Sequence, residues 1–148
     1  MSQSSQVIHT LKEIAARDLN KAAERLAESN RLLMDAKTQR EMLQKYKEDY
    51  VAKYSALLSQ GTNRESMQNY QSFLQKLDQA IAGQEQIIGG MDRQVKRHLV
   101  NWQECQKKKL SYDVLSNRSD KKVIAKELKA DQKMMDEFAS RAKRMAHY

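Results

Sequence analysis

The 148-residue sequence contains no proline, one cysteine, four glycines and only nine aromatic side chains. Proline ends helices and punctuates loops, and a globular chain of this length normally carries about seven at the usual ~5%. Its absence favours long, uninterrupted helices over a compact fold with many turns. Because one cysteine cannot form an internal disulfide, a secreted domain held together by disulfides is excluded and a reducing cytosol is expected.

Long hydrophobic runs are also missing. No stretch approaches the roughly 18 consecutive apolar residues that a membrane span needs. The first five residues are polar and uncharged, unlike the basic start and apolar core of a signal peptide. We therefore expect a soluble, cytoplasmic protein.

Turn-forming residues gather at one place, Ser59 to Asn63, around Gly61. This segment predicts a turn over 59–63 between a first helix of about 6–58 and a second of about 63–142. Thr62 precedes Glu65 by three positions, which is the spacing of a capping box at the start of a helix. Gly83, Gly89 and Gly90 each weaken the second helix by about 1 kcal/mol relative to alanine, so it either bends there or passes straight through.

Both predicted helices carry an apolar stripe with alternating spacings of three and four residues. The stripe runs from Ile8 to Leu57 in the first helix and from Met67 to Ser116 in the second, and 11 of 15 positions are apolar in each. This spacing is typical of the seam between two coiled-coil helices. A short connection makes the helices antiparallel neighbours. We therefore predict one all-α domain, a long two-helix antiparallel coiled-coil hairpin with unequal arms.

The second arm is the longer one, so its end should extend past the first arm. Folding the chain about Gly61 places Ile8 opposite residues near 113–114, which leaves 115–148 as an overhang. The overhang has an apolar stripe of its own at Ile124, Leu128, Met135, Phe138 and Met145. An apolar stripe that nothing in the chain covers predicts a docking surface.

The charge is concentrated in the C-terminal part. Residues 1–92 hold 12 basic and 12 acidic side chains, whereas residues 93–148 hold 15 basic and 7 acidic. Such a basic segment can be a solvated face or can meet an acidic protein surface, anionic lipid or nucleic acid. We expect no nucleic-acid binding, because no stacking aromatics, zinc pattern or basic region joined to a heptad repeat accompanies these charges.

Residues for catalysis or metal binding are not grouped in the sequence. His9, His98 and His147 are far apart, and the chain has neither a glycine-rich phosphate loop nor a cluster with metal-ligand spacing. His98 and Cys105 fall on the seam, where a register-setting polar residue and a small apolar thiol are the simpler interpretation. We therefore predict a protein that is not an enzyme and has no cofactor or metal.

Three segments, Asp131–Ala142, Tyr46–Tyr50 and Asn69–Ile81, carry a resemblance to a known family, the FliJ family of bacterial flagellar export proteins. The run from Asp131 to Ala142 (DQKMMDEFASRA) looks like the family's C-terminal signature. The segments Tyr46–Tyr50 and Asn69–Ile81 match its hairpin tip in the same order. Chain length, hairpin position and opening helix fit as well. Between Gly83 and Asp120 the similarity is mainly one of pattern.

The resemblance implies a soluble part of the flagellar type III export apparatus, shaped like the central stalk of the rotary ATP synthase and inserted in the export ATPase ring. The ring contact would then involve Leu11, Ile14 and Arg17 of the first helix. On the overhang it would involve Met135, Phe138 and Arg141.

The family's other partners are the membrane export-gate protein FlhA and empty export chaperones. Residues matching Phe73 and Leu77 contact the linker of FlhA. Leu77 is also a seam position, whereas Phe73 lies beside the seam. The resemblance thus implies a protein that associates peripherally with the cell membrane through the export apparatus and that is a monomeric hairpin when free.

Two other classes share this architecture. One is the stalk protein of a virulence-type secretion system, from which only the motif wording distinguishes this chain. The other is a dimerising coiled-coil scaffold, whose mass, unlike that of a monomeric hairpin, would depend on concentration.

Overall fold

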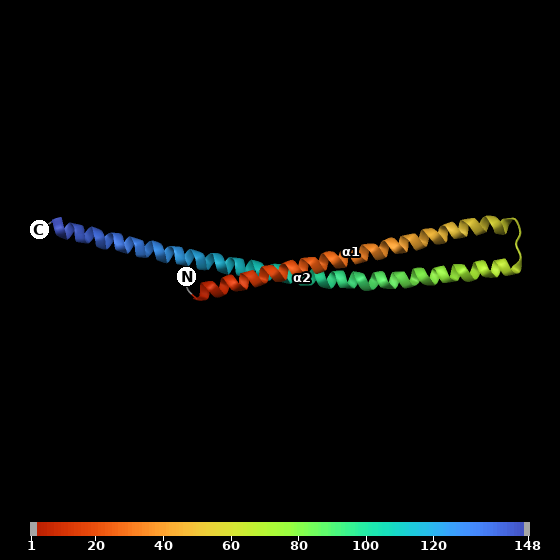
Figure 1. Cartoon of the computed structure of the whole chain (residues 1–148), viewed down its shortest axis with the longest axis horizontal. Helices are drawn as coiled ribbons and strands as arrows, with labels where there is room; N and C mark the ends of the chain where they lie inside the picture. Colours follow the sequence, from red (N-terminus) through yellow and green to blue (C-terminus); the bar gives the residue numbers. More distant parts are fainter. Residues whose placement is uncertain (1–2, 147–148) are drawn as a thin grey trace. The chain divides into compact units, whose positions relative to one another are not determined.

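The structure, a computed structural model, describes residues 3–146, which form two α-helices. Helix α1 spans Gln3–Ser59 and helix α2 spans Arg64–Ala146, with 57 and 83 residues. The described residues contain no strand. The predicted all-α fold with two unequal antiparallel helices is therefore confirmed (Figure 1). Both helices extend about three residues further toward the termini than the sequence analysis expected.

The turn between the helices ends in a helix cap that differs from the predicted one. Gly61 has a φ of +91°, a left-handed conformation that glycine adopts without steric penalty. The side-chain oxygen of Asn63 accepts a hydrogen bond from the backbone N–H of Ser66 at 2.8 Å. The capping residue is therefore Asn63, one position after Thr62, because α2 begins at Arg64.

The chain forms two compact units. The hairpin unit comprises Ala22–Trp102, and thus the turn and the parts of both helices next to it. The terminal unit combines residues 3–21 with residues 103–146, since residues 1, 2, 147 and 148 lie outside the described range. His147 therefore lies outside it as well.

The predicted seam is buried or half-buried in both units. This holds for every assigned position from Ile8 to Tyr54 of α1 and from Met67 to Ser116 of α2. The last position of α1 is wrong. Leu57 is exposed and Leu58 is half-buried instead, because the chain already turns at Gln60, whose N–H bonds the carbonyl of Leu57.

The centre of the hairpin unit is packed with small and branched side chains. Ala22, Ser29 and Ala36 are almost fully buried along α1. Leu33 and Ala36 pack with Ile88, and Met91 and Val95 contact this cluster. Small residues at every seventh position let the two helix backbones approach closely here.

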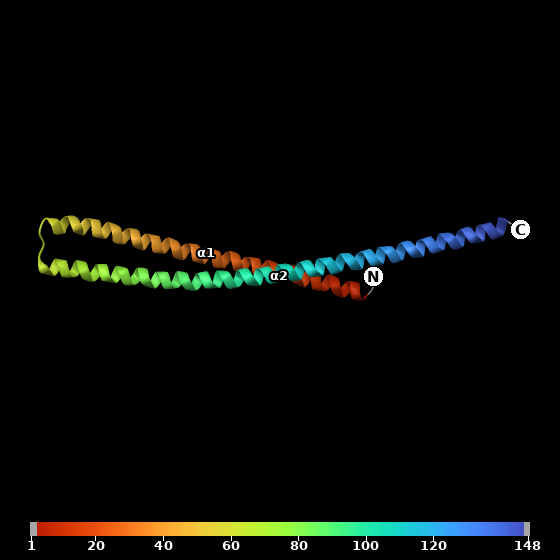
Figure 2. The same ribbon diagram turned by 180° about the vertical axis from the view of Figure 1, so that it is seen from behind.

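Five aromatic rings form a cluster between the two helices of the hairpin unit near the turn. Tyr50 stacks on Tyr70 with ring centroids 5.5 Å apart, and it contacts Tyr54 and Phe73 at 4.5 Å each. Tyr46 meets Phe73 edge to face at 6.3 Å. These rings are larger than the alanines farther along the seam, and α1 and α2 lie farther apart toward the turn (Figures 1 and 2).

In the terminal unit, the start of α1 lies beside α2. Ser5, Ala15 and Ser116 are buried in the seam. Two ion pairs at the edges join the helices, His9 to Asp120 at 3.8 Å and Lys12 to Asp113 at 3.6 Å. Val123 is the last half-buried residue of α2, and every described residue from 124 onward is exposed.

The uncovered part of α2 is therefore shorter than expected, starting near residue 124 instead of 115. Two features explain the difference. Helix α1 begins at Gln3, and His9 pairs with Asp120, so the register is shifted by several residues from the one that folding about Gly61 predicts. Helix α2 itself is continuous through Gly83, Gly89, Gly90 and Ser116.

Candidate docking surfaces

The C-terminal segment of α2, residues 124–146, presents an uncovered apolar stripe in the terminal unit. Met135 and Phe138 are 73% and 75% exposed, and Ile124, Leu128 and Met145 are exposed as well. At 100° per residue these five side chains fall within one side of the helix. Monomeric soluble proteins rarely leave such a stripe open to water, so it is suited to contact a partner.

The opposite side of this segment is basic. Lys126, Lys129 and Lys133 lie across the helix from the apolar stripe. Arg141 lies at the border of the two sides and lines a shallow polar groove with Lys133, Ser140 and Arg144 and with two acidic residues, Asp136 and Glu137. The segment is therefore amphipathic, with an apolar surface and a polar surface on which basic residues outnumber acidic ones.

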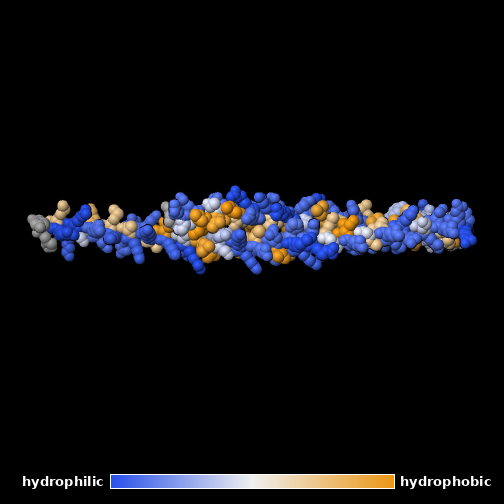
Figure 3. All heavy atoms as spheres, turned by 90° about the horizontal axis from the view of Figure 1, so that it is seen from below, coloured by the Kyte–Doolittle hydropathy of each residue, from blue (hydrophilic) through white to orange (hydrophobic). Residues whose placement is uncertain are grey.

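A second apolar patch lies at the start of α1 in the terminal unit. Ile14 is 42% exposed, Leu11 is half-buried, and Arg17 is exposed. Val7 and Leu115, which the sequence analysis did not assign, are exposed too. Val7 follows the seven-residue spacing of Ile14, and this repeat could have identified it. In Figure 3 hydrophobic side chains gather beside the N-terminal end of α1.

The two residues proposed for the export gate lie in the hairpin unit in different environments. Leu77 is 7% exposed and belongs to the core. Phe73 is half-buried at the edge of the aromatic cluster, against Tyr46 and Tyr50. Tyr46 is 54% exposed and is thus the most accessible ring of this cluster, whereas Phe73 is half-buried beside it and Leu77 is buried in the seam. The exposure of Tyr46 beside Phe73 was not foreseen.

The side chains of Tyr50 and Glu28, both in the hairpin unit, have shifted pKa values. Burial, together with the neighbouring tyrosines, raises the pKa of Tyr50, so its hydroxyl stays protonated in the ring cluster. Away from the cluster, a hydrogen bond from Arg31 lowers the pKa of Glu28, which therefore stays ionised.

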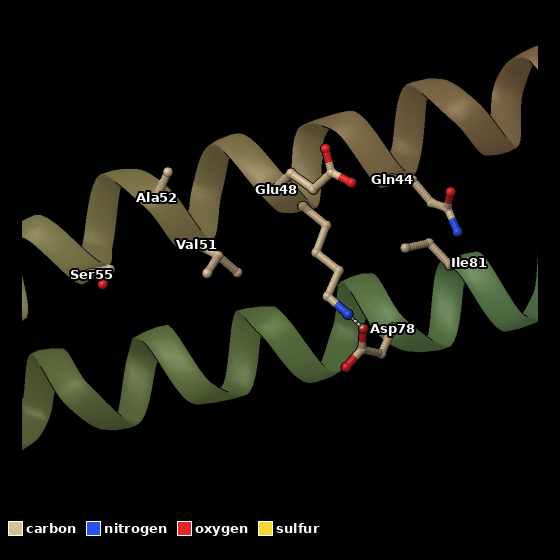
Figure 4. Close-up of a pocket in the computed structure, with 8 residues that line it drawn as sticks. Gln44, Glu48, Val51, Ala52, Ser55, Asp78 and Ile81 are labelled. Atoms are coloured by element: carbon tan, nitrogen blue, oxygen red, sulfur yellow. Dashed lines mark ion pairs between the residues drawn. The ribbon is translucent and has the colours of Figure 1, made fainter.

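An open groove lies on the other side of the seam near the turn (Figure 4). It has a volume of about 590 Å³, and Val51, Ala52 and Ile81 give it an apolar part. Lys47 and Asp78 bridge the two helices across it with an ion pair of 2.5 Å. A second bridge, Arg40 to Glu85 at 3.4 Å, lies seven residues away along each helix. This side of the hairpin is thus crossed by charged bridges.

Residues 3–146 hold no group of three or more histidine, cysteine or acidic side chains placed to bind a metal ion. His98 and Cys105 are half-buried on the seam, as predicted. Within the same range, neither helix has a segment long and apolar enough to cross a membrane.

The sequence comparisons agree with the resemblance found in the three segments. The sequence model of the family described as "Flagellar FliJ protein" matches residues 5–146. The chain is 32% identical to the flagellar FliJ protein of Escherichia coli K12 over 133 residues, 90% of each chain. It is 30% identical to that of Salmonella typhi over 135 residues, 91% of this chain and 92% of the relative. No solved structure matches significantly.

Proposed function

This chain belongs to the FliJ family, whose members serve the protein export apparatus of the bacterial flagellum, and we propose that it is a non-catalytic coupling component of that apparatus. It binds the export ATPase ring through the terminal unit and the export-gate protein FlhA through the hairpin unit. It also binds empty export chaperones. It associates with the membrane peripherally, through these partners, and is monomeric when free.

The uncovered stripe of α2 carries this proposal. Met135 and Phe138 are exposed on the segment 124–146 of α2, which nothing else in the described chain covers. Burying such side chains against a partner stabilises a complex by about 1.5–3 kcal/mol for each one fully buried. Leu11, Ile14 and Arg17, with Val7 and Leu115, supply a second apolar area in the same unit. The ATPase ring contacts both areas.

The ring contact can be tested with two matched double variants of the full chain. Met135→Ser with Phe138→Ser should weaken binding to the purified export ATPase by at least tenfold in a surface-binding assay. Lys126→Ser with Lys129→Ser, on the opposite side of the same segment, should retain most of the affinity. Equal losses in both variants, or unchanged binding in the first, would contradict the proposal.

The gate contact is best tested at Phe73, because Leu77 is part of the core. Phe73→Ala should abolish binding to the linker of FlhA and leave ATPase binding unchanged. Leu77→Ala would instead weaken the hairpin itself, and its effect on binding would mix two causes. Loss of both interactions in Phe73→Ala, or of neither, would reject the division of the two partners between the two units.

A coupling role follows from this division. ATP-driven changes in the ring act on the terminal unit, and the hairpin unit biases the gate toward export. The protein transmits a conformational change and performs no chemistry. Sedimentation at two concentrations tests the monomeric state, since a dimerising scaffold would show a mass that rises with concentration.

A further inference from the structure

One side of the hairpin unit carries accessible apolar side chains, and the helices are linked there by a long hydrogen bond from Gln84 Nε2 to Gln39 Oε1 at 3.4 Å, with no ion pair across this side among the described residues. Tyr46 and Phe73 are in contact on this side. Leu32 lies two heptads before Tyr46 in α1, and Ile87 lies two heptads after Phe73 in α2. Because the helices are antiparallel, Leu32 and Ile87 also lie opposite each other. Leu32 is 37% and Ile87 49% exposed. They define an apolar groove between the two helices.

Two cavities follow this groove along α1. One, of about 400 Å³, is lined by Gln39, Met42, Leu43 and Tyr46. The other, of about 300 Å³, includes Leu32 of α1 and Gln94 and His98 of α2. The ion pairs Lys47–Asp78 and Arg40–Glu85 lie at the other edge of the seam. This side of the hairpin unit therefore combines open space with exposed apolar side chains of both helices, and no ion pair of residues 3–146 crosses it.

Two glycines form the border of the groove on α2, although both positions have room for a larger side chain. Gly83 and Gly90 lie seven residues apart, on the same side of α2 as Ile87. A Cβ atom at Gly83 would meet nothing within 4 Å, and one at Gly90 would meet only the end of the Arg93 side chain at 3.8 Å. Glycine is a poor helix former. Packing inside the hairpin gives no reason for it here, whereas close approach of an external backbone does.

The charges at the two ends of the glycine border are basic. Lys76 lies seven residues before Gly83 and Arg97 seven residues after Gly90, on the same side of α2. The border on α1 carries Glu24 and Glu28, with Arg25 beside them. A ligand lying along the groove would thus meet cations on the α2 side and mainly carboxylates at one end of the α1 side.

We propose that this glycine-bordered groove, defined by Leu32, Tyr46, Gly83, Ile87 and Gly90, binds an amphipathic helix of an export chaperone. The apolar stripe of that helix packs on Leu32 and Ile87, its backbone lies over the two glycines, and its acidic edge faces Lys76 and Arg97. The inference rests on the proposed function for the identity of the partner. Of the three partner classes, only the chaperones had no residues assigned to them.

The glycines provide a test in which stability and binding move in opposite directions. The double variant Gly83→Ala with Gly90→Ala should raise the melting temperature, because alanine is the better helix former and both positions have room. It should also weaken binding of a purified, cargo-free export chaperone at least tenfold in calorimetric titration. Gly89→Ala is the matched control. Its Cβ also meets only Arg93, at 3.7 Å, but it lies on another side of α2, so affinity should stay within twofold.

The apolar and charged parts are tested with exposed residues, whose replacement leaves the core intact. Ile87→Ser should weaken chaperone binding at least tenfold, whereas Met34→Ser, at an even more exposed apolar position outside the groove, should not. Arg97→Glu should weaken binding and reduce its dependence on salt. Lys96→Glu, which lies on another side of α2, should change it within twofold.

The outcomes separate the inference from the proposed function. If the chaperone binds the wild-type chain and all variants equally, the groove assignment is wrong and the function stands. If Gly89→Ala weakens binding as much as the double variant, helix stiffness and not close approach explains the effect, and the assignment is again wrong. If the chaperone does not bind the wild-type chain, that part of the proposed function fails and the groove assignment fails with it.

Discussion

Two regions of α2 carry the same kind of apolar stripe, but the stripe is buried in one region and exposed in the other. Between Met67 and Val123 the stripe is covered by α1, and Leu77 there is 7% exposed. Between residues 124 and 146 nothing in the described chain covers it, and Phe138 is 75% exposed. The difference teaches that a seam pattern specifies the need for a partner helix but not which chain supplies it. In the covered region the partner is α1, and in the uncovered one the described chain supplies none.

The largest expected contrast is between one core leucine and one uncovered phenylalanine. Leu77→Ala removes a buried side chain and leaves a cavity, so it should lower the free energy of unfolding by about 2–4 kcal/mol. Phe138→Ala should change it by less than about 0.5 kcal/mol, because the ring has no contacts to lose within the chain. Urea unfolding followed by circular dichroism measures both. A large loss for Phe138→Ala would mean that the segment folds back and is not free.

A second contrast is between a buried alanine of the covered region and an exposed alanine of the uncovered one. Ala22 is 2% exposed where the helices approach closely. Ala22→Leu should destabilise the hairpin by about 1–3 kcal/mol, because the extra atoms push the helices apart. Ala130→Leu, at an exposed site of the uncovered segment, should be nearly neutral. Thermal unfolding of the two variants decides the matter, and equal melting temperatures would argue against close packing at Ala22.

The helix cap gives an effect of intermediate size. Asn63→Ala removes the acceptor for the N–H of Ser66 and should cost about 1 kcal/mol of stability. Thr62→Ala should have little effect, since Thr62 is not the capping residue. If Thr62→Ala proved the more damaging of the two in urea unfolding, the capping box predicted from the sequence would be correct and the observed cap wrong.

The sequence predicted the seam well because burial in a two-helix structure follows directly from a repeat of three and four residues. Only the end was missed, where Leu58 replaces Leu57. The exact ends of the helices were harder to predict than the seam. The turn contains both Thr62 and Asn63, two competent caps, and choosing the other one shifts the start of a helix by a residue.

One candidate surface could be predicted from the sequence and another could not. The stripe at Met135 and Phe138 was visible from spacing alone, because nothing opposes it. The groove beside Ile87 was not, since it arises only when Leu32 and Ile87 are brought together from distant parts of the chain. The glycines 83 and 90 were read as weak points of the helix. Their position on one border of a groove requires the register between the helices.

The smallest expected effect concerns ionisation in the covered aromatic cluster. The raised pKa of Tyr50 means that the folded state holds the phenolic proton more tightly than the unfolded state, whose value is near 10. Stability should therefore be constant with respect to this group below about pH 10 and fall as the pH rises through the folded pKa. Tyr50→Phe removes the group and should make the loss of stability above about pH 10 shallower, as measured by urea midpoints. A Tyr50→Phe profile that parallels the wild type would show that the cluster does not distinguish the neutral from the ionised ring.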